Sequence, residues 1–478
     1  MAARFMASSP VLLFLFSSQD GRINRRLLAT TSGLCGAILG AVCSGAMDES
    51  HMNHLVRAVG RVLGEGTKTD FLWSIRLRAY KPQPLDYATS PSMKITNIEV
   101  ISNRYPLVTV TTDEGVTGIG ATSASPAAIR SIIESEEDGL RQMLIGEDPT
   151  QTNRLWRKMY YGYPGNRGRA CEGGVDINAM AAIDMALWDL LGKARQLPIH
   201  QLLGGAVQPR MLAYASGTSA DMHVMEERGG WVDKTEEQLR QECETFLELG
   251  FKAIKFGWGE DFGPRRQKLL AAIRDTIGSE VRLMLDMGPP DYNKHIRTLK
   301  DVIEVARVAE EFDVYFLEEP MLPDDIAGHR AVKDSCDVRI PTGESLTTLR
   351  QFIDYLEQEA VDVIQPDAQQ IGITQFFRVA QRAEEGRILC IPHSPWTAMA
   401  VAAHVNVLST VINSVMIEYP AFASYGPGTR GHTQTRIMHE SIIEHPLVFE
   451  EGFIELPTQP GLGLGEYVPE AVAELEVS

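Results

Sequence analysis

The chain has 478 residues, of which 44% are hydrophobic and 23% are charged. This length and composition are sufficient for two or three domains with a large buried core, and they exclude an intrinsically disordered or fibrous protein. Six cysteines without a CxxC pair argue against a zinc ribbon and a disulfide framework. The net charge of −18 is spread along the chain, which argues against nucleic acid or an anionic membrane as a partner.

The first fifth of the chain differs in charge from the rest. Residues 1–92 hold ten Lys and Arg against six Asp and Glu, a balance of +4, whereas residues 93–478 hold 35 and 57, a balance of −22. Arg25-Arg26 precede an uncharged stretch at 27–46 that is typical of a twin-arginine export signal, although its glycines make it a poor membrane anchor. An organelle transit segment, or an extension that the working protein lacks, are the alternatives. If the protein starts at Met93, we expect it to be soluble and cytoplasmic.

Residues 93–207 predict an α+β unit. Apolar and polar residues alternate in MKITNIEV and in PLVTVTTDEGVTGIGATS, which predicts strands, with a hairpin turn at 113–115. Apolar residues at helical spacing predict helices at 130–144 and 179–194. The size of this unit is ordinary for one domain.

After Arg210, short β-rich runs alternate with amphipathic helices such as 267–277, 299–312 and 373–385. The runs are 211–217, 253–257, 282–286, 314–319, 339–344, 361–367, 387–393 and 414–420. This alternation predicts parallel strands with helical crossovers, and eight is the number that closes a (β/α)8 barrel. We therefore expect a barrel domain at 208–435 and a separate C-terminal segment at 436–478.

Ionisable residues stand at or beside the ends of seven of these runs, at intervals of 23 to 32 residues. They are Lys255, Asp286, Glu318, Glu344, Asp367, His393 and Glu418. One carboxylate after a strand could simply cap the next helix. Seven in register instead predict a shared site at the C-terminal end of the barrel, where such enzymes place their chemistry.

Three consecutive strand ends supply Asp286, Glu318 and Glu344. Three carboxylates are hard oxygen ligands, so we expect them to bind Mg²⁺, with Mn²⁺ as an alternative. No Cys or His lies among the three, which disfavours zinc.

Two basic residues flank this predicted metal site. Lys255 stands on one side, and His393 stands on the other with Asp367 one strand earlier, where a carboxylate would fix the imidazole tautomer. Because residues two apart in a strand share a face, Lys255 should point into the barrel with Ala253, and Lys252 should point out toward the helices.

From Met93 to the C-terminus, the chain resembles the enolase superfamily, and within it the mandelate racemase group that includes many acid-sugar dehydratases. The motifs are AIDMALWD at 182–189, LLGG at 202–205, LEEP at 317–320, GES at 343–345 and PDAQQIGI at 366–373, with a closing segment LPTQPGLGL at 456–464. The resemblance implies an α/β fold: a modified (β/α)8 barrel, with an α+β capping domain formed by residues 93–207 and by the C-terminal segment.

The resemblance also implies roles for the strand-end residues. The three carboxylates match the metal ligands, Lys255 matches the second lysine of a K-x-K motif, His393 and Asp367 match a His-Asp dyad, and Glu418 matches an acid that hydrogen-bonds the substrate carboxylate. Two positions depart from the commoner pattern: Ala253 replaces the first lysine of K-x-K, and Met-Gly-Pro-Pro follows the first metal ligand.

These residues together suggest a Mg²⁺-dependent dehydratase of an acid sugar, an aldonate or an aldarate. Lys255 or His393 would remove the proton α to the carboxylate, the metal and Glu418 would stabilise the enediolate, and loss of the 3-hydroxyl would give a 2-keto-3-deoxy acid. A racemase or epimerase of a 2-hydroxy acid, or a lactone cycloisomerase, could use the same site. A non-catalytic acid-sugar binder is disfavoured, because no base or ligand is missing.

Candidate substrate contacts lie in the cap and beside two strands. Tyr161, Arg167 and Arg169 belong to a glycine-rich run with groups suited to hydroxyls or a carboxylate, although a solvated loop would look the same. Trp258 and Trp396 follow two strands, where they could line the pocket or pack under the cap. Three other histidines are interpreted as core or surface residues: His200, His404 and His432. We expect a small-molecule carboxylate as the binding partner, and a homo-oligomer.

Overall fold

The computed structural model describes residues 93–101, 106–166, 173–220, 232–259, 261–288, 297–394, 397–419 and 442–475. The described residues all belong to one compact unit. Residues 1–92, and with them Arg25-Arg26, lie outside the described residues. Among the described helices, none has both the length and the hydropathy that a membrane span needs.

The described part opens with an antiparallel sheet, whose strands are β1 (Ile95–Val100), β2 (Leu107–Thr112) and β3 (Thr117–Ala121). The hairpin predicted at 113–115 is confirmed: the Gly115 amide donates to the Thr112 carbonyl (3.1 Å), and Gly115 has a φ of 79°. Glycine adopts this left-handed conformation without steric cost. Ile98 and Val110 of the sheet share a buried cluster with Ile129 of the first cap helix.

The helices of the cap are α6 (Pro126–Glu134), α7 (Leu140–Leu144), α8 (Thr152–Gly162), the 3₁₀ turn η1 (Pro164–Asn166), α9 (Val175–Arg195) and α10 (Ile199–Leu202). The single helix predicted at 130–144 is wrong. Its sequence SEEDG at 135–139 has no apolar residue to continue the buried face, and Ser135 Oγ there donates to Asp138 Oδ1 (2.6 Å). Such local side-chain bonds favour a turn over a helix.

Helix α9 is buried on all sides along most of its length. The helix predicted at 179–194 is confirmed, since α9 covers it. Every residue from Ile177 through Leu190 is buried. The helix contacts the cap strand β3 and also the barrel helix α17 (Ala368–Glu385). A helix that is buried around its whole circumference is typical of such an interface between two packed layers.

The barrel strands are β4 (Arg210–Thr218), β5 (Ala253–Gly257), β6 (Arg282–Asp286), β7 (Val314–Glu318), β8 (Pro341–Thr342), β9 (Val363–Ile364), β10 (Leu389–Cys390) and β11 (Ile417–Tyr419). Strands β4 to β7 pair in parallel, β8 to β10 pair in parallel, and β11 pairs with β4. Backbone bonds from Leu317 to Arg339 (2.9 Å) and from Cys390 to Asn413 (3.0 Å) join these groups into a ring. The predicted α/β barrel is therefore confirmed.

Strands β8, β9 and β10 are shorter than the runs that predicted them. Each of these runs contains a proline: Pro341, Pro366 or Pro392. Proline has no amide hydrogen to donate, so the hydrogen-bonded ladder stops beside it. Strand β7 also ends one residue early, because Glu319 takes a left-handed φ of 51°.

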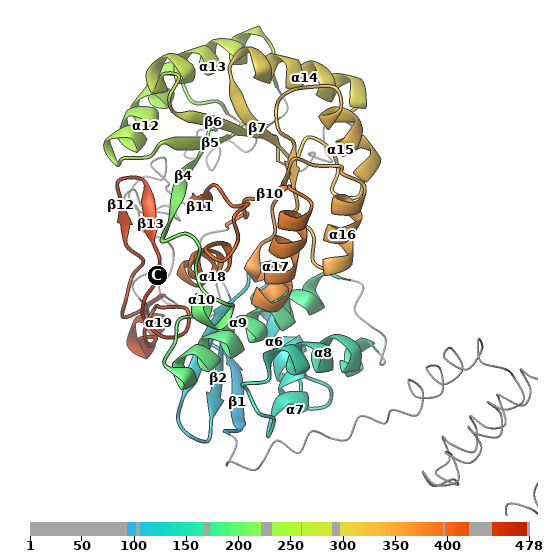
Figure 1. Cartoon of the computed structure of the whole chain (residues 1–478), viewed down its shortest axis with the longest axis vertical. Coiled ribbons are helices and arrows are strands. Elements are labelled where there is room, and N and C mark those ends of the chain that lie inside the picture. Colours follow the sequence, from blue (N-terminus) through green and yellow to red (C-terminus); the bar gives the residue numbers. More distant parts are fainter. Residues whose placement is uncertain are drawn as a thin grey trace, which may run out of the picture. The chain divides into compact units, whose positions relative to one another are not determined.

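Helices α12 (Glu236–Glu248), α13 (Pro264–Ile277), α14 (Leu299–Glu311), α15 (Ile326–Lys333), α16 (Leu349–Glu357), α17 and α18 (Ala398–Leu408) connect the strands. Figure 1 shows α12 to α15 on the outer side of β5, β6 and β7. Three of the helices begin with a capping box, at Thr235, Thr298 and Thr348. A capping box satisfies two amides that the first turn of a helix leaves unpaired, so these threonines mark where the helices start.

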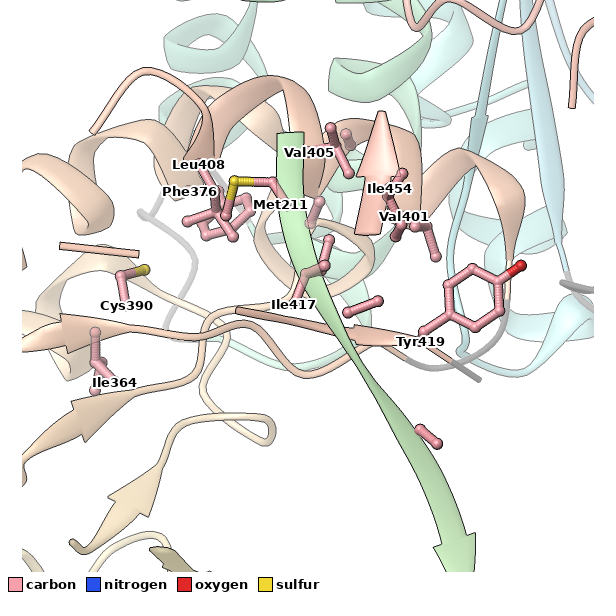
Figure 2. Close-up of a cluster of buried hydrophobic side chains, with 14 of the residues drawn as sticks. Met211, Ile364, Phe376, Cys390, Val401, Val405, Leu408, Ile417, Tyr419 and Ile454 are labelled. Carbon is pink, nitrogen blue, oxygen red and sulfur yellow. The ribbon is translucent and has the colours of Figure 1, made fainter. Parts of the chain in front are cut away.

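The strands bury one face inside the barrel and the other against the helices. The inner cluster consists of Tyr214, Ala253, Met284, Phe316, Val363, Ile391 and Met416. Figure 2 shows part of the outer cluster, where Ile364 and Cys390 lie with Phe376 of α17. Ala253 thus points inward as predicted, whereas Lys252 is exposed and its Nζ lies 5.2 Å from the ring centre of Phe453.

The C-terminal segment contacts both the barrel and the cap. Its elements are β12 (Phe449–Glu450), β13 (Phe453–Glu455) and α19 (Pro469–Leu475), and β13 pairs antiparallel with β4. The Leu462 amide donates to Asp189 of α9 (2.8 Å), and the Ile199 amide donates to the Gly461 carbonyl (3.0 Å). The closing segment is therefore fixed to the cap helices.

Candidate active site

The structure gathers all seven predicted strand-end residues at the C-terminal end of the barrel. Five of them stand two positions after a residue of the inner apolar cluster and therefore share its face: Lys255, Asp286, Glu318, His393 and Glu418. Asp286 pairs with Glu318 in the ladder between β6 and β7. Alternation along parallel strands thus turns a sequence pattern into one cluster of charged side chains.

Lys255 lies among three carboxylates. Its Nζ is 2.9 Å from Glu318 Oε2, 3.1 Å from Glu418 Oε1 and 3.5 Å from Asp286 Oδ2. The side chain of Lys255 is only 3% exposed and that of Glu318 is fully buried. Paired charges in this position interact strongly, because little water screens them.

Burial and charge act in opposite directions on this cluster. Burial lowers the pKa of Lys255, but the carboxylates of Glu318 and Glu418 outweigh it and hold that pKa well above its usual value. Burial raises the pKa of Glu318, and the neighbouring carboxylates of Asp286 and Glu418 raise it further against the effect of Lys255. The cluster therefore has more buried negative charge than one ammonium compensates.

His393 lies between two other carboxylates of the strand-end cluster, those of Asp367 and Glu344. Its Nδ1 is 3.4 Å from Asp367 Oδ2, and its Nε2 is 3.5 Å from Glu344 Oε2. Burial lowers the pKa of His393, but Glu344 and Asp367 together raise it to about 10. The imidazole is therefore held in a fixed orientation, with a carboxylate facing each ring nitrogen.

Asp367 contacts a second histidine, which the sequence interpretation did not connect with the site. His404 of α18 is fully buried, and its Nε2 lies 3.3 Å from Asp367 Oδ1 and 2.9 Å from the Ala368 amide nitrogen. Asp367 also accepts from the Gln369 amide (2.8 Å) as the N-cap of α17. A lone histidine in the apolar helix AMAVAAHVNVL was the one sequence signal of this contact.

Glu418 connects the two halves of the cluster. One oxygen pairs with Lys255, and the other accepts a hydrogen bond from the Ser394 amide (3.0 Å), next to His393. Burial raises the pKa of Glu418, but Lys255 and His393 outweigh it and lower that pKa. Glu418 therefore lies between the two predicted bases.

The carboxylates of Asp286, Glu318 and Glu344 fit a divalent cation by their chemistry. Burial and the Asp286 charge raise the pKa of Glu344, as they do for Glu318. Added positive charge would therefore stabilise these three carboxylates in their ionised form. Three carboxylate oxygens with open positions for substrate suit Mg²⁺ or Mn²⁺. Within the described residues, no group of three Asp, Glu, His or Cys side chains is arranged to coordinate a metal ion. Asp286 and Glu318 instead pair with Lys255.

Two family models match the chain. The N-terminal domain model of mandelate racemase and muconate lactonizing enzyme matches residues 86–204, and the enolase C-terminal domain-like model matches residues 238–465. The chain belongs to the mandelate racemase and muconate lactonizing enzyme group of the enolase superfamily. The predicted class of enzyme, a hydro-lyase or an isomerase, is thereby confirmed.

Members of this family with known names resemble the chain over most of its length. D-galactonate dehydratase of Variovorax paradoxus (strain S110) is 28% identical over 78% of this chain and 92% of its own. The crystal structure of 3,6-anhydro-D-galactonate cycloisomerase from Zobellia galactanivorans is 29% identical, with a TM-score of 0.66 over 80% of this chain and 99% of that one. A Bordetella bronchiseptica RB50 structure assigned as a mandelate racemase is 31% identical, with a TM-score of 0.67 over 80% and 95%.

The AIDMALWD motif lies on α9 of this superfamily member, where the cap meets the barrel. Trp188 Nε1 donates to Thr374 Oγ1 of α17 (2.9 Å). Asp189 accepts from the Ile119 amide of β3 (3.0 Å) and from the closing segment. The PDAQQIGI motif lies on the barrel side of this contact between cap and barrel, because it includes the start of α17, which packs against α9. Helix α17 is kinked within the motif at Gly372, which has a φ of 72°. Both motifs therefore join cap to barrel.

The predicted substrate contacts of this superfamily member stay predictions. Tyr161, at the end of α8, is 61% exposed and packs edge-to-face on Tyr160. Trp258 is fully buried, and the Arg266 guanidinium stacks on its ring at 4.3 Å. The other three candidate substrate contacts lie outside the described residues: Arg167, Arg169 and Trp396. His432 lies outside them as well.

Proposed function

We propose that this chain is a Mg²⁺-dependent dehydratase of an acid sugar. The observation that carries the proposal is the placement of two bases, Lys255 and His393, on opposite sides of a group of buried and partly buried carboxylates. A dehydratase needs this arrangement, because one group must take a proton from C2 while another gives a proton to the leaving hydroxyl at C3. The resemblance to D-galactonate dehydratase supports the same class of substrate.

Asp286, Glu318 and Glu344 would hold the Mg²⁺. When bound, the ion would polarise the substrate carboxylate, which makes the C2 proton more acidic and stabilises negative charge on the carboxylate oxygens. The Lys255 ammonium now occupies the space beside two of these ligands. It must therefore give up part of its contact with them when the ion binds.

The side chains of the chain itself supply the proton transfers. Lys255 or His393, in its neutral form, removes the proton from C2, according to which face of C2 it meets, and the electron pair left on C2 forms the enediolate. The carboxylates raise the pKa of both groups, so a cation bound to those carboxylates would favour the neutral form. The bond from C3 to its hydroxyl oxygen then breaks, and His393 gives the leaving oxygen a proton, so that water departs. The enol that remains takes up a proton at C3 and loses the proton of its C2 hydroxyl, which gives the 2-keto-3-deoxy acid. Glu418, which contacts Lys255 and the Ser394 amide, would hydrogen-bond the substrate carboxylate between the two bases.

A panel of aldonic and aldaric acids incubated with the full-length chain and Mg²⁺ tests the proposal. We expect one or more acids to yield a 2-keto-3-deoxy product, detected by its keto group and by the loss of one water in mass spectrometry. His393→Asn and Lys255→Ala should both abolish turnover. His393→Asn should leave Mg²⁺ binding in calorimetry intact, and Lys255→Ala should leave it intact or make it tighter, since neither residue is a proposed ligand and the Lys255 ammonium contacts two of them. Activity retained in both variants contradicts the assignment of the bases.

A cycloisomerase is the second candidate, favoured by the likeness to the Zobellia galactanivorans enzyme. Such an enzyme would use the same proton abstraction, but the bond that breaks at C3 would belong to a ring ether, so the product keeps the mass of the substrate. An anhydro-aldonate added to the panel separates the two. A product of unchanged mass, with no dehydration of any acid, favours the cycloisomerase, or a racemase if only the configuration at C2 changes.

A further inference from the structure

Arg297 connects the two loops that carry the first two proposed metal ligands. Its Nη2 donates to the carbonyls of Met287 and Gly288 (both 2.8 Å), directly after Asp286 at the end of β6. Its Nη1 donates to the carbonyls of Glu319 (2.7 Å) and Pro320 (3.4 Å), directly after Glu318 at the end of β7. One planar guanidinium thereby links the C-terminal ends of two neighbouring strands.

The backbone that Arg297 holds is strained and close to the ligand oxygens. Glu319 has a φ of 51°, which a non-glycine residue keeps only where its surroundings hold it. The Gly288 amide donates to Asp286 Oδ1 (2.6 Å), and the Met287 amide donates to the Glu318 carbonyl (3.1 Å). A shift of either loop would therefore move the carboxylates.

A second arginine makes the same kind of bridge at the other end of the same two strands. Arg274 donates to the carbonyls of Gly278 (2.8 Å) and Val281 (2.9 Å) before β6, and to those of Phe312 (3.0 Å) and Asp313 (2.8 Å) before β7. This bridge lies at the N-terminal ends of the strands, away from the charged cluster. The chain thus contains a matched pair, of which one member lies at the site.

We propose that Arg297 is a positioning residue that holds the backbone directly after Asp286 and Glu318, so that both carboxylates can reach one divalent cation. The inference rests on the proposed function, since it presumes the metal site. Mg²⁺ demands nearly ideal octahedral geometry at short distances, so small displacements of its ligands reduce affinity. A lysine could not replace the arginine, because an ammonium is a point charge and cannot span both loops with a rigid fork of donors.

The affinity of the full-length chain for Mg²⁺ tests the inference, measured by calorimetry with MgCl₂ alone on wild type, Arg297→Met, Arg297→Lys and Arg274→Met. We expect both Arg297 variants to bind Mg²⁺ about 10- to 100-fold more weakly, as is usual when a group supporting metal ligands is removed. Arg274→Met should lower the melting temperature and leave Mg²⁺ affinity unchanged. The lysine variant decides the outcome if the methionine variant does not fold.

The possible failures are distinguishable. A wild type that binds no Mg²⁺ overturns the metal site of the proposed function, and the inference falls with it. If wild type and the Arg297 variants bind Mg²⁺ equally well, the role of Arg297 is overturned and the proposed metal site is not. If Arg274→Met weakens Mg²⁺ binding as much as Arg297→Met, the effect is general loss of stability, and a specific role for Arg297 is also overturned.

Discussion

Asp184 of the cap helix α9 accepts two hydrogen bonds from Thr374 of the barrel helix α17. Its Oδ2 lies 2.8 Å from the Thr374 amide nitrogen, and its Oδ1 lies 2.6 Å from Thr374 Oγ1. Thr374 lies in the first turn after the kink at Gly372 in α17, so the helix effectively starts again there. The first turn of a helix has backbone amides without a partner inside the helix. A carboxylate from the cap therefore acts as the helix cap for part of the barrel.

The stability of the protein should fall with rising pH because of this carboxylate. Burial raises the pKa of Asp184 from its usual 3.8 to about 7, although the bonds from Thr374 lower it. A pKa raised in the folded state favours the protonated form, so the contribution to stability is present below pH 4 and is lost as the pH rises through 7. The contribution lost is up to about 4 kcal/mol.

Asp184→Asn isolates that effect, because the amide has a similar shape and does not titrate. The free energy of unfolding of the variant minus that of wild type should increase between pH 5 and pH 8, measured by urea denaturation. Asp275→Asn, at a carboxylate that is 73% exposed, serves as the control and should give a flat difference. A flat difference for Asp184→Asn as well would contradict the prediction.

Gly372→Ala should destabilise the same joint. An added Cβ would lie 2.7 Å from Asp184 Oδ2, and the φ of 72° strains any other residue. We expect a loss of about 1–3 kcal/mol in the free energy of unfolding. Gly386→Ala, at the end of the same helix, has an ordinary φ of −79° and no atom closer than 3.5 Å to the new Cβ, and it should be neutral or slightly stabilising. Equal losses at both glycines would argue against this account.

Lys255→Met should destabilise the metal-free protein and respond strongly to Mg²⁺. The substitution leaves the carboxylates of Glu318 and Glu418 buried without their partner, and breaking a buried pair costs about 3–5 kcal/mol. A cation on the carboxylates would replace part of the lost charge, so Mg²⁺ should raise the melting temperature of the variant more than that of wild type. Lys252→Met, at the exposed lysine, is the matched control. An equal response to Mg²⁺ in wild type and Lys255→Met would contradict the expectation that the ion replaces the charge of Lys255.

Asp367→Asn should lower kcat by about 10²- to 10⁴-fold with little change in KM, because an amide no longer stabilises the charged imidazole of His393. The fold should survive, since asparagine caps a helix as well as aspartate does, and Asp367 caps α17. Steady-state kinetics on the acid that proves to be the substrate give kcat and KM, and circular dichroism checks the fold. A kcat within a few-fold of wild type would show that His393 works without this carboxylate.

Much of the barrel and the composition of the site could be predicted from local pattern. Alternation within each strand places Lys255 inside and Lys252 outside, and this needs no knowledge of the neighbouring strands. The repeated spacing of strand-end residues predicts a shared edge, because parallel strands in a barrel end on the same side. Prediction failed where several weak local preferences compete, as at 135–139, where a polar turn divides an expected helix.

The partners of the predicted residues could not be read from the sequence. Asp184 and Thr374 are 190 residues apart, and His404 meets Asp367 only because α18 packs beside α17. Arg297 likewise finds its carbonyls only once β6 and β7 lie side by side. The sequence by itself determined which side chains reach the barrel mouth, since this follows from strand periodicity. The tertiary structure alone decided what holds them there, because those bonds form between elements that meet only in the packed fold.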